Sequence, residues 1–206
     1  MAFNYMYKFL IIGDEAVGKS SICTRMAGEQ FKSWYDHTIG VEFSVCYSKI
    51  YDNIVIKSQL WDTSGRRVFL PVIDSYFKGV IAILLVYDVT NRNSFNKIDF
   101  WLNKIKNNCD SGDKLNIFLI GNKIDLKSKR EISKKEGQEK ALKEKLTFFE
   151  TSAKHDENID FIKRTICKII YDNTDPKEHH PGIKLPTSLK LKDPEEYSYR
   201  DCCYCS

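Results

Sequence analysis

The chain contains the stretch Gly13-Asp14-Glu15-Ala16-Val17-Gly18-Lys19-Ser20, which lies between a predicted strand at 7–12 and a predicted helix at 19–27. Glycines at both ends of this loop allow a tight turn and a close approach of the backbone to a ligand. The N–H groups of the loop and of the helix start can then bind phosphate oxygens. Lys19 would neutralise the outer phosphates, and Ser20 would offer a hydroxyl to Mg²⁺. A chance glycine-rich turn is the alternative, and the flanking strand and helix argue against it.

The same alternation of strand and helix continues along the chain. The predicted strands are 7–12, 41–49, 54–60, 80–87, 117–120 and 147–150, and the predicted helices are 19–27, 94–107, 133–146 and 158–171. This order predicts an α/β fold with a six-stranded, mostly parallel sheet and helices on both faces. A hairpin that turns at 51–53 adds one antiparallel edge strand. Ligands of such sheets bind at the carboxyl ends of the strands.

The composition indicates one globular domain, at 1–174, followed by a flexible tail at 175–206 with four prolines and no apolar period. The chain has 206 residues, is 42% hydrophobic and carries a net charge of +4. This small basic excess gives no reason to expect nucleic acid as a partner. No secretory signal and no apolar run of roughly 18 residues is visible, so we expect a cytosolic protein unless a lipid attaches it to a membrane. Four scattered cysteines are expected to be buried thiols: Cys23, Cys46, Cys109 and Cys167.

A second motif, Asn122-Lys123-x-Asp125, follows the strand at 117–120. The Asp125 carboxylate can accept hydrogen bonds from the guanine N1–H and 2-amino groups. Adenine has neither donor and would leave the carboxylate unpaired, so the motif argues against an ATPase or a nucleotide kinase. The stem of Lys123 can cover the ring, and Asn122 can tie this loop to the phosphate loop. An ordinary polar turn is the alternative for this motif taken alone.

A third motif, Glu150-Thr151-Ser152-Ala153-Lys154, follows the next strand. Here the Ala153 N–H could meet the guanine O6, Ser152 could brace Asp125, and Phe31 could stack on the base. Finding this motif after the next strand weakens the interpretation of Asn-Lys-x-Asp as a mere turn. Together the three motifs predict a guanine-nucleotide site.

In this order and spacing the motifs resemble those of the Ras superfamily of small GTPases, over residues 7–172. Four further stretches are similar to its Rab branch: Ile39-Gly40-Val41-Glu42-Phe43, Leu60-Trp61-Asp62-Thr63, Ser75-Tyr76-Phe77-Lys78-Gly79 and Leu85-Val86-Tyr87-Asp88-Val89-Thr90. The resemblance implies a P-loop small GTPase fold, GTP or GDP with Mg²⁺ as cofactors, and a switch that regulates membrane traffic. It also implies a location on the cytoplasmic face of an intracellular membrane, with a cytosolic pool.

The resemblance also implies roles for single residues. Thr38 would contact Mg²⁺ and the γ-phosphate, Asp62 would hold Mg²⁺ through water, and the Gly65 N–H would meet the γ-phosphate. The metal positions are thus Ser20, Thr38 and Asp62, and the catalytic positions are Lys19, Thr38 and Arg66. The implied nucleotide-binding set is Gly13, Asp14, Glu15, Ala16, Val17, Gly18, Lys19, Ser20, Ser21, Phe31, Tyr35, Thr38, Asp62, Gly65, Asn122, Lys123, Asp125, Ser152, Ala153 and Lys154.

Partners follow from the same resemblance. They are a guanine nucleotide exchange factor, a GTPase-activating protein, a GDP dissociation inhibitor with a prenylation escort, and effectors; the protein itself is expected to be a monomer. Phe43, Trp61 and Tyr76 would form an exposed aromatic surface that effectors contact. Without the resemblance, the same three aromatic residues would be assigned to the core.

Two departures from the family pattern, at Glu15 and Arg66, bear on hydrolysis. The family sequence Asp-Thr-Ala-Gly-Gln-Glu is here Asp62-Thr63-Ser64-Gly65-Arg66-Arg67, and Glu15 occupies a loop position that is usually small. Arginine has no hydrogen-bond acceptor, so Arg66 cannot orient a water as glutamine does. We hypothesise that Glu15 and Arg66 pair in the GTP state, and we expect slow hydrolysis.

The departures leave three other hypotheses open. The chain could be a GTP-bound adaptor without turnover, Arg66 could act as an arginine finger, or Arg66 could favour GDP or no nucleotide.

The sequence ends in Cys202-Cys203-Tyr204-Cys205-Ser206, which has the form of a prenylation signal, either a CaaX box or a Cys-x-Cys pair. From residue 176 onward, five basic residues balance five acidic ones, so the tail has no polybasic second signal. The charged residues are Lys177, Lys184, Lys190, Lys192 and Arg200 against Glu178, Asp193, Glu195, Glu196 and Asp201. Two lipids on Cys202, Cys203 or Cys205 would therefore anchor the chain better than one.

Overall fold

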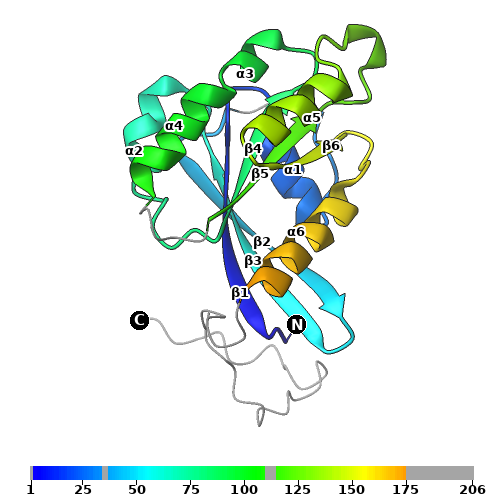
Figure 1. The fold of residues 1–206 in the computed structure, drawn as a ribbon. Coiled ribbons are helices and arrows are strands. Elements are labelled where there is room, and N and C mark those ends of the chain that lie inside the picture. The colour runs from blue at the N-terminus through cyan, green and yellow to red at the C-terminus, as the bar shows by residue number, and fades with distance from the viewer. Residues whose placement is uncertain (1, 34–36, 110–114, 175–206) are drawn as a thin grey trace, which may run out of the picture.

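The computed structural model describes residues 2–33, 37–109 and 115–174. A six-stranded sheet forms its centre, with helices on both faces (Figure 1). In chain order the strands are β1 Tyr5–Gly13, β2 Val41–Tyr51, β3 Ile54–Thr63, β4 Ala82–Asp88, β5 Asn116–Asn122 and β6 Thr147–Thr151. The α-helices are α1 Lys19–Met26, α2 Leu70–Asp74, α3 Arg92–Asn96, α4 Ile98–Asn108, α5 Lys134–Lys143 and α6 Ile159–Asn173. Short 3₁₀ turns occupy Arg67–Phe69 and Lys127–Lys129.

The strand order is β2-β3-β1-β4-β5-β6. Only β2 runs antiparallel to its neighbour, β3, and the other pairs are parallel. The predicted fold class, including the single antiparallel edge strand, is therefore confirmed. Because the parallel strands all end at one edge of the sheet, the loops after β1, β3, β5 and β6 meet there.

Two apolar cores cover the two faces of the sheet, and β1 supplies both by alternation. Phe9 and Ile11 belong to the core under α1 and α6. Leu10 and Ile12 belong to the core under α2, α4 and α5. Because β1 is anchored in both cores, the position of the loop that begins at Gly13 is fixed relative to the sheet.

The helix predicted at 94–107 is wrong as a single element. The structure has two helices, α3 and α4, which are separated at Lys97, where φ is −83° and ψ is 0°. The apolar period crosses this break without interruption, so periodicity gave no sign of it. α3 also begins earlier than predicted, because the Asn91 side chain accepts hydrogen bonds from the N–H groups of Asn93 and Ser94.

Other differences from the predicted elements are smaller. The short helix α2 was not predicted, and α5 ends at Lys143 instead of 146. The predicted capping box of α5 is present, with Ser133 and Glu136 bonding each other's backbone N–H groups. Within the described residues, we find no helix with the length and apolar character needed to cross a membrane. The tail predicted at 175–206 lies outside the described residues.

Candidate functional site

The loop between β1 and α1 passes very close to two neighbouring strands. Gly13 has a φ of +144°, and a Cβ there would lie 2.2 Å from the Val86 carbonyl oxygen. Gly18 has a φ of +96°, and a Cβ there would lie 2.3 Å from Nδ2 of Asn122. Because both positions combine a left-handed backbone with almost no space, only glycine fits either one.

Lys19 begins α1 and is 5% exposed. Its ammonium group donates to two carbonyl oxygens of the same loop, at 3.0 Å to Gly13 and 2.7 Å to Asp14. Burial lowers the pKa of Lys19 to about 8, against the opposing effects of Asp62 and Asp14. A buried cation enclosed by backbone is well placed to bind a phosphate group.

Three oxygen-bearing side chains from different elements meet beside Lys19. The Ser20 hydroxyl donates to Asp62 Oδ2 at 2.6 Å, and its oxygen lies 3.0 Å from the Thr38 hydroxyl. The Thr38 hydroxyl lies 3.3 Å from the same Asp62 oxygen. Burial raises the pKa of Asp62 to about 6, although the Ser20 hydrogen bond and the Lys19 charge oppose this.

This oxygen cluster fits a hard divalent cation. The other carboxylate oxygen of Asp62, Oδ1, is buried and has no hydrogen-bond partner. Carboxylate and hydroxyl oxygens are ligands that Mg²⁺ accepts. Within the described residues, no group of three or more His, Cys, Asp or Glu side chains could hold a metal by itself. A cation here would therefore need further oxygens, such as those of a phosphate.

Asn122, at the end of β5, joins three loops. It is 1% exposed, and its Nδ2 donates to the Val17 carbonyl at 3.0 Å. Its Oδ1 accepts from the Thr151 hydroxyl and from the Ala153 N–H, both at 3.2 Å. The tie to the phosphate loop agrees with the sequence interpretation. The Ala153 N–H, which we expected to meet a base, donates to Asn122 in this structure.

Lys123 and Asp125 follow Asn122 in the same loop. The Ser152 hydroxyl donates to Asp125 Oδ1 at 2.6 Å, which is the brace expected from the sequence. The Lys123 ammonium group donates to the Ala16 carbonyl at 2.7 Å and pairs with Asp88 at 2.7 Å. Lys123 therefore connects its own loop to the phosphate loop, as Asn122 does.

Two contacts of the site had no signal in the sequence. Arg25, on α1, donates to the carbonyl oxygens of Ala153 at 2.9 Å and Lys154 at 3.0 Å. Lys97, at the break between α3 and α4, pairs with Asp14 of the phosphate loop at 2.6 Å. Both partners are far apart in the sequence, so no local pattern could have paired them.

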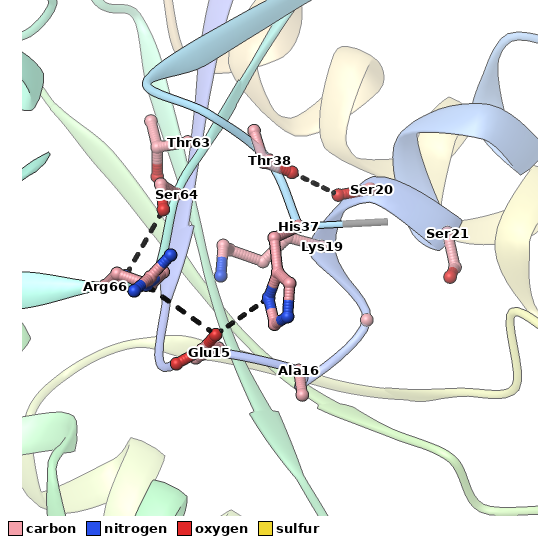
Figure 2. A pocket seen from close by; sticks show the side chains of 12 residues that line it. Glu15, Ala16, Lys19, Ser20, Ser21, His37, Thr38, Thr63, Ser64 and Arg66 are labelled. Carbon is pink, nitrogen blue, oxygen red and sulfur yellow. Dashed lines mark hydrogen bonds and ion pairs between the residues drawn. The ribbon is translucent and has the colours of Figure 1, made fainter. Parts of the chain in front are cut away.

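Glu15 has two partners in the site, His37 and Arg66. His37 Nδ1 lies 2.9 Å from Glu15 Oε1, and Arg66 Nε lies 4.0 Å from the same oxygen. Figure 2 shows Glu15 between these two side chains, and Lys19 and Ser20 line the same hollow. The sequence led us to hypothesise a pair between Glu15 and Arg66 for the GTP state, which stays untested, and it gave no sign of the nearer partner, His37.

The loop that carries Arg66 is also packed onto the phosphate loop through its backbone. A Cβ on Gly65 would lie 2.3 Å from the Glu15 nitrogen, so no larger residue fits there. The Ser64 N–H donates to the Gly40 carbonyl at 2.8 Å, and the Thr63 hydroxyl donates to the Ile11 carbonyl at 2.8 Å. The loops after β3 and before β2 are therefore in contact with each other as well as with residues 13–20.

The aromatic residues Phe43, Trp61 and Tyr76 form a continuous row. Ring centroids are 5.0 Å apart for Phe43 and Trp61, and 5.2 Å apart for Trp61 and Tyr76. Phe43 is 52% exposed, while Trp61 and Tyr76 pack partly against the core under α2 and α4. The row is therefore neither fully exposed nor part of the core: its Phe43 end is exposed, and its Trp61 and Tyr76 end is half-buried.

The structure describes some of the remaining predicted site residues and not others. Ala16 and Ser21 line the same hollow as Lys19, and Phe31 is half-buried after α1. Tyr35 and the cysteines Cys202, Cys203 and Cys205 lie outside the described residues. Of the four cysteines expected to be buried, Cys23, Cys46 and Cys167 are buried, but the prediction is wrong for Cys109, which is half-buried because it lies just past the end of α4.

The Ras family model matches residues 8–172, which is nearly all of the described chain. The chain belongs to the Ras family. Within the family it belongs to the Rab branch, since its relatives there are 34–41% identical.

Three relatives illustrate this similarity. Ras-related protein Rab-11B of Dictyostelium discoideum is 41% identical over 169 residues, covering 82% of this chain and 76% of that protein. Ras-related protein Rab-13 of Rattus norvegicus is 34% identical, covering 98% of this chain and 97% of that protein. Ras-related protein Rab2BV of Beta vulgaris is 35% identical, covering 98% and 95%.

Proposed function

We propose that this chain is a Rab-type molecular switch that binds GTP or GDP together with Mg²⁺. The observation that supports this most strongly is Asp125, whose carboxylate is held by Ser152 at 2.6 Å beside a junction built on Asn122. A fixed carboxylate can accept both guanine donors and leaves adenine unmatched. The phosphate loop lies at the same edge of the sheet, so one nucleotide can reach both.

Each part of the site has a distinct role in this proposal. Backbone N–H groups of residues 13–20 and Lys19 hold the phosphates. Ser20, Thr38 and Asp62 supply oxygens to Mg²⁺, which neutralises phosphate charge when it is bound. Thr38 and Gly65 bring the two switch loops, around 37–40 and 64–70, to the third phosphate. Loss of that phosphate would release both loops.

Hydrolysis of GTP is expected to be slow. Arg66 presents only donors, so it cannot accept a hydrogen bond from the attacking water. The Glu15 carboxylate also lines the hollow where the outer phosphate would lie, and it adds negative charge there. The second candidate function follows from the same residues: a GTP-bound adaptor that recruits effectors without turnover.

The cellular role proposed here is control of vesicle traffic. Effectors would contact the aromatic row Phe43, Trp61 and Tyr76, whose Phe43 end is exposed. An exchange factor, a GTPase-activating protein, a GDP dissociation inhibitor and a prenylation escort complete the set of partners of a monomeric switch. Prenyl groups on the terminal cysteines would hold the protein on the cytoplasmic face of an intracellular membrane. Mass spectrometry of protein from its own cells tests this, and an absence of isoprenoid mass would contradict it.

Nucleotide competition tests the binding proposal. Protein loaded with fluorescent GDP is challenged with GTP, GDP or ATP in the presence of Mg²⁺. We expect GTP and GDP to displace the probe at concentrations at least about 10⁴-fold lower than ATP. Equal displacement by ATP would contradict a guanine site.

A single-turnover assay separates the switch from the adaptor. Protein loaded with γ-labelled GTP is followed for phosphate release without added partners, and then with a GTPase-activating protein. Slow release that the activating protein accelerates supports the switch. No release under either condition supports the adaptor.

A further inference from the structure

One carboxylate contacts both switch loops. The Glu15 oxygen Oε1 lies 2.9 Å from His37, which precedes Thr38 in the first switch loop. The same oxygen lies 4.0 Å from Arg66 in the second switch loop. Figure 2 shows that the His37 and Arg66 side chains approach Glu15 from opposite sides of the hollow.

We propose that Glu15 is a positioning residue that holds both switch loops against the phosphate loop without the help of a third phosphate. In the proposed function, one phosphate orders both loops through Thr38 and Gly65. In this structure the Glu15 carboxylate contacts one residue from each loop, as the third phosphate would. The inference rests on the proposed function, because the loops are switch loops only if the chain binds guanine nucleotides.

The backbone around Glu15 supports this role. Gly65 packs against the Asp14 and Glu15 backbone so closely that a Cβ would lie 2.3 Å from the Glu15 nitrogen. Asp14, the preceding residue, is held by Lys97 at 2.6 Å. Lys97 therefore fixes the segment that carries the carboxylate from outside the switch loops, and Gly65 shows that the second switch loop already packs against this segment.

The size of the effect is limited by solvent. The side chains of Glu15, His37 and Arg66 are 40%, 57% and 49% exposed. Contacts of this exposure shift a local equilibrium by roughly fivefold at most. Glu15 therefore biases the loops toward the closed arrangement and does not lock them. With GDP bound, the loops should be closed more often than in a variant that lacks this carboxylate.

Hydrogen exchange of the two loops tests the inference. Peptides covering 37–43 and 64–70 are compared between the wild type and Glu15→Ser, each loaded with GDP, each without nucleotide, and each with a non-hydrolysable GTP analogue. We expect exchange of both peptides to rise about twofold to fivefold in the first two states. With the GTP analogue the change should be less than about twofold, because the third phosphate then holds the loops.

Three further variants make the result specific. His37→Asn should raise exchange in 37–43 alone, and Arg66→Gln should raise it in 64–70 alone. The matched control is Glu139→Ser on α5, whose side chain is 64% exposed and pairs only distantly, at 3.8 Å, with Lys135. This control removes the same charge and should change neither peptide.

Either of two results would overturn the inference: an unchanged pair of peptides in Glu15→Ser, or a change in only one of them. Failure of the proposed function is recognised separately, by measuring the nucleotide that the protein retains after loading. If no guanine nucleotide is retained, the proposed function fails. The nucleotide-free comparison still decides whether Glu15 holds the loops.

Discussion

The junction at the ends of β5 and β6 and the cluster around Glu15 are held by contacts of different kinds. Asn122 is 1% exposed and makes three hydrogen bonds of 3.0–3.2 Å with two other segments, the phosphate loop and the end of β6. Glu15 and its partners are 40–57% exposed, and one of the two contacts is at 4.0 Å. We therefore expect the first region to keep its geometry whether or not a ligand is bound, and the second to open at a small energetic cost.

This difference matches the two tasks in the proposed function. Recognition of a base needs an acceptor whose position is already fixed, because flexible groups lose affinity when they are ordered. A switch needs two arrangements that differ by a few kcal/mol, so its contacts must be weak enough to break. The following substitutions test whether the two regions differ in this way.

The largest effect is expected at Asp125 in the buried region. Asp125→Ala removes an acceptor for two charged hydrogen bonds to guanine, so GDP affinity should fall by about 10³-fold. Titration with fluorescent GDP measures this. Asp52→Ala removes the same carboxylate from a hairpin turn, where it is fully exposed, and should leave affinity unchanged. Equal losses in both variants would show that Asp125 does not contact the base.

A smaller effect is expected at Gly18, where the two regions meet. A Cβ at Gly18 meets Asn122 at 2.3 Å, and the residue also has a φ of +96°. Gly18→Ala should lower the free energy of unfolding by about 3 kcal/mol, measured by urea denaturation. Gly28 has a φ of +87° but no atom within 4 Å of a Cβ. Gly28→Ala should therefore lower the free energy of unfolding by only about 1 kcal/mol. Equal losses in the two variants would mean that the Asn122 side chain moves aside at little energetic cost.

The smallest effect concerns the coupling of Glu15 and Arg66. Glu15→Ser with Arg66→Gln should restore GTP hydrolysis more than either change alone, because it removes a negative charge and returns an acceptor for water. At 4.0 Å and half exposed, the pair should cause a departure from additivity of no more than about fivefold. Single-turnover rates of the four proteins measure it. Strict additivity would eliminate the pairing.

Much of the fold could be predicted from local patterns. The alternation of short apolar runs with helical periods predicted six strands and their mostly parallel arrangement, which the structure confirms. Periodicity failed at Lys97, because the apolar residues on both sides of the break face the same core. The backbone turn there is associated with a contact to Asp14, 83 residues away, which no local rule could anticipate.

The site divides in the same way. The sequence by itself indicated candidate residues for phosphate and base, because glycine, lysine, serine and aspartate at these spacings have a limited chemistry, whereas Thr38 and Asp62 were implied as metal positions by the family resemblance. Only the tertiary structure decided that Lys123 reaches Ala16, that Arg25 holds the loop at 153–154, and that His37 is the nearer partner of Glu15. The physical reason is that side-chain contacts form between segments that the sheet brings together, and spacing along the chain does not record those distances.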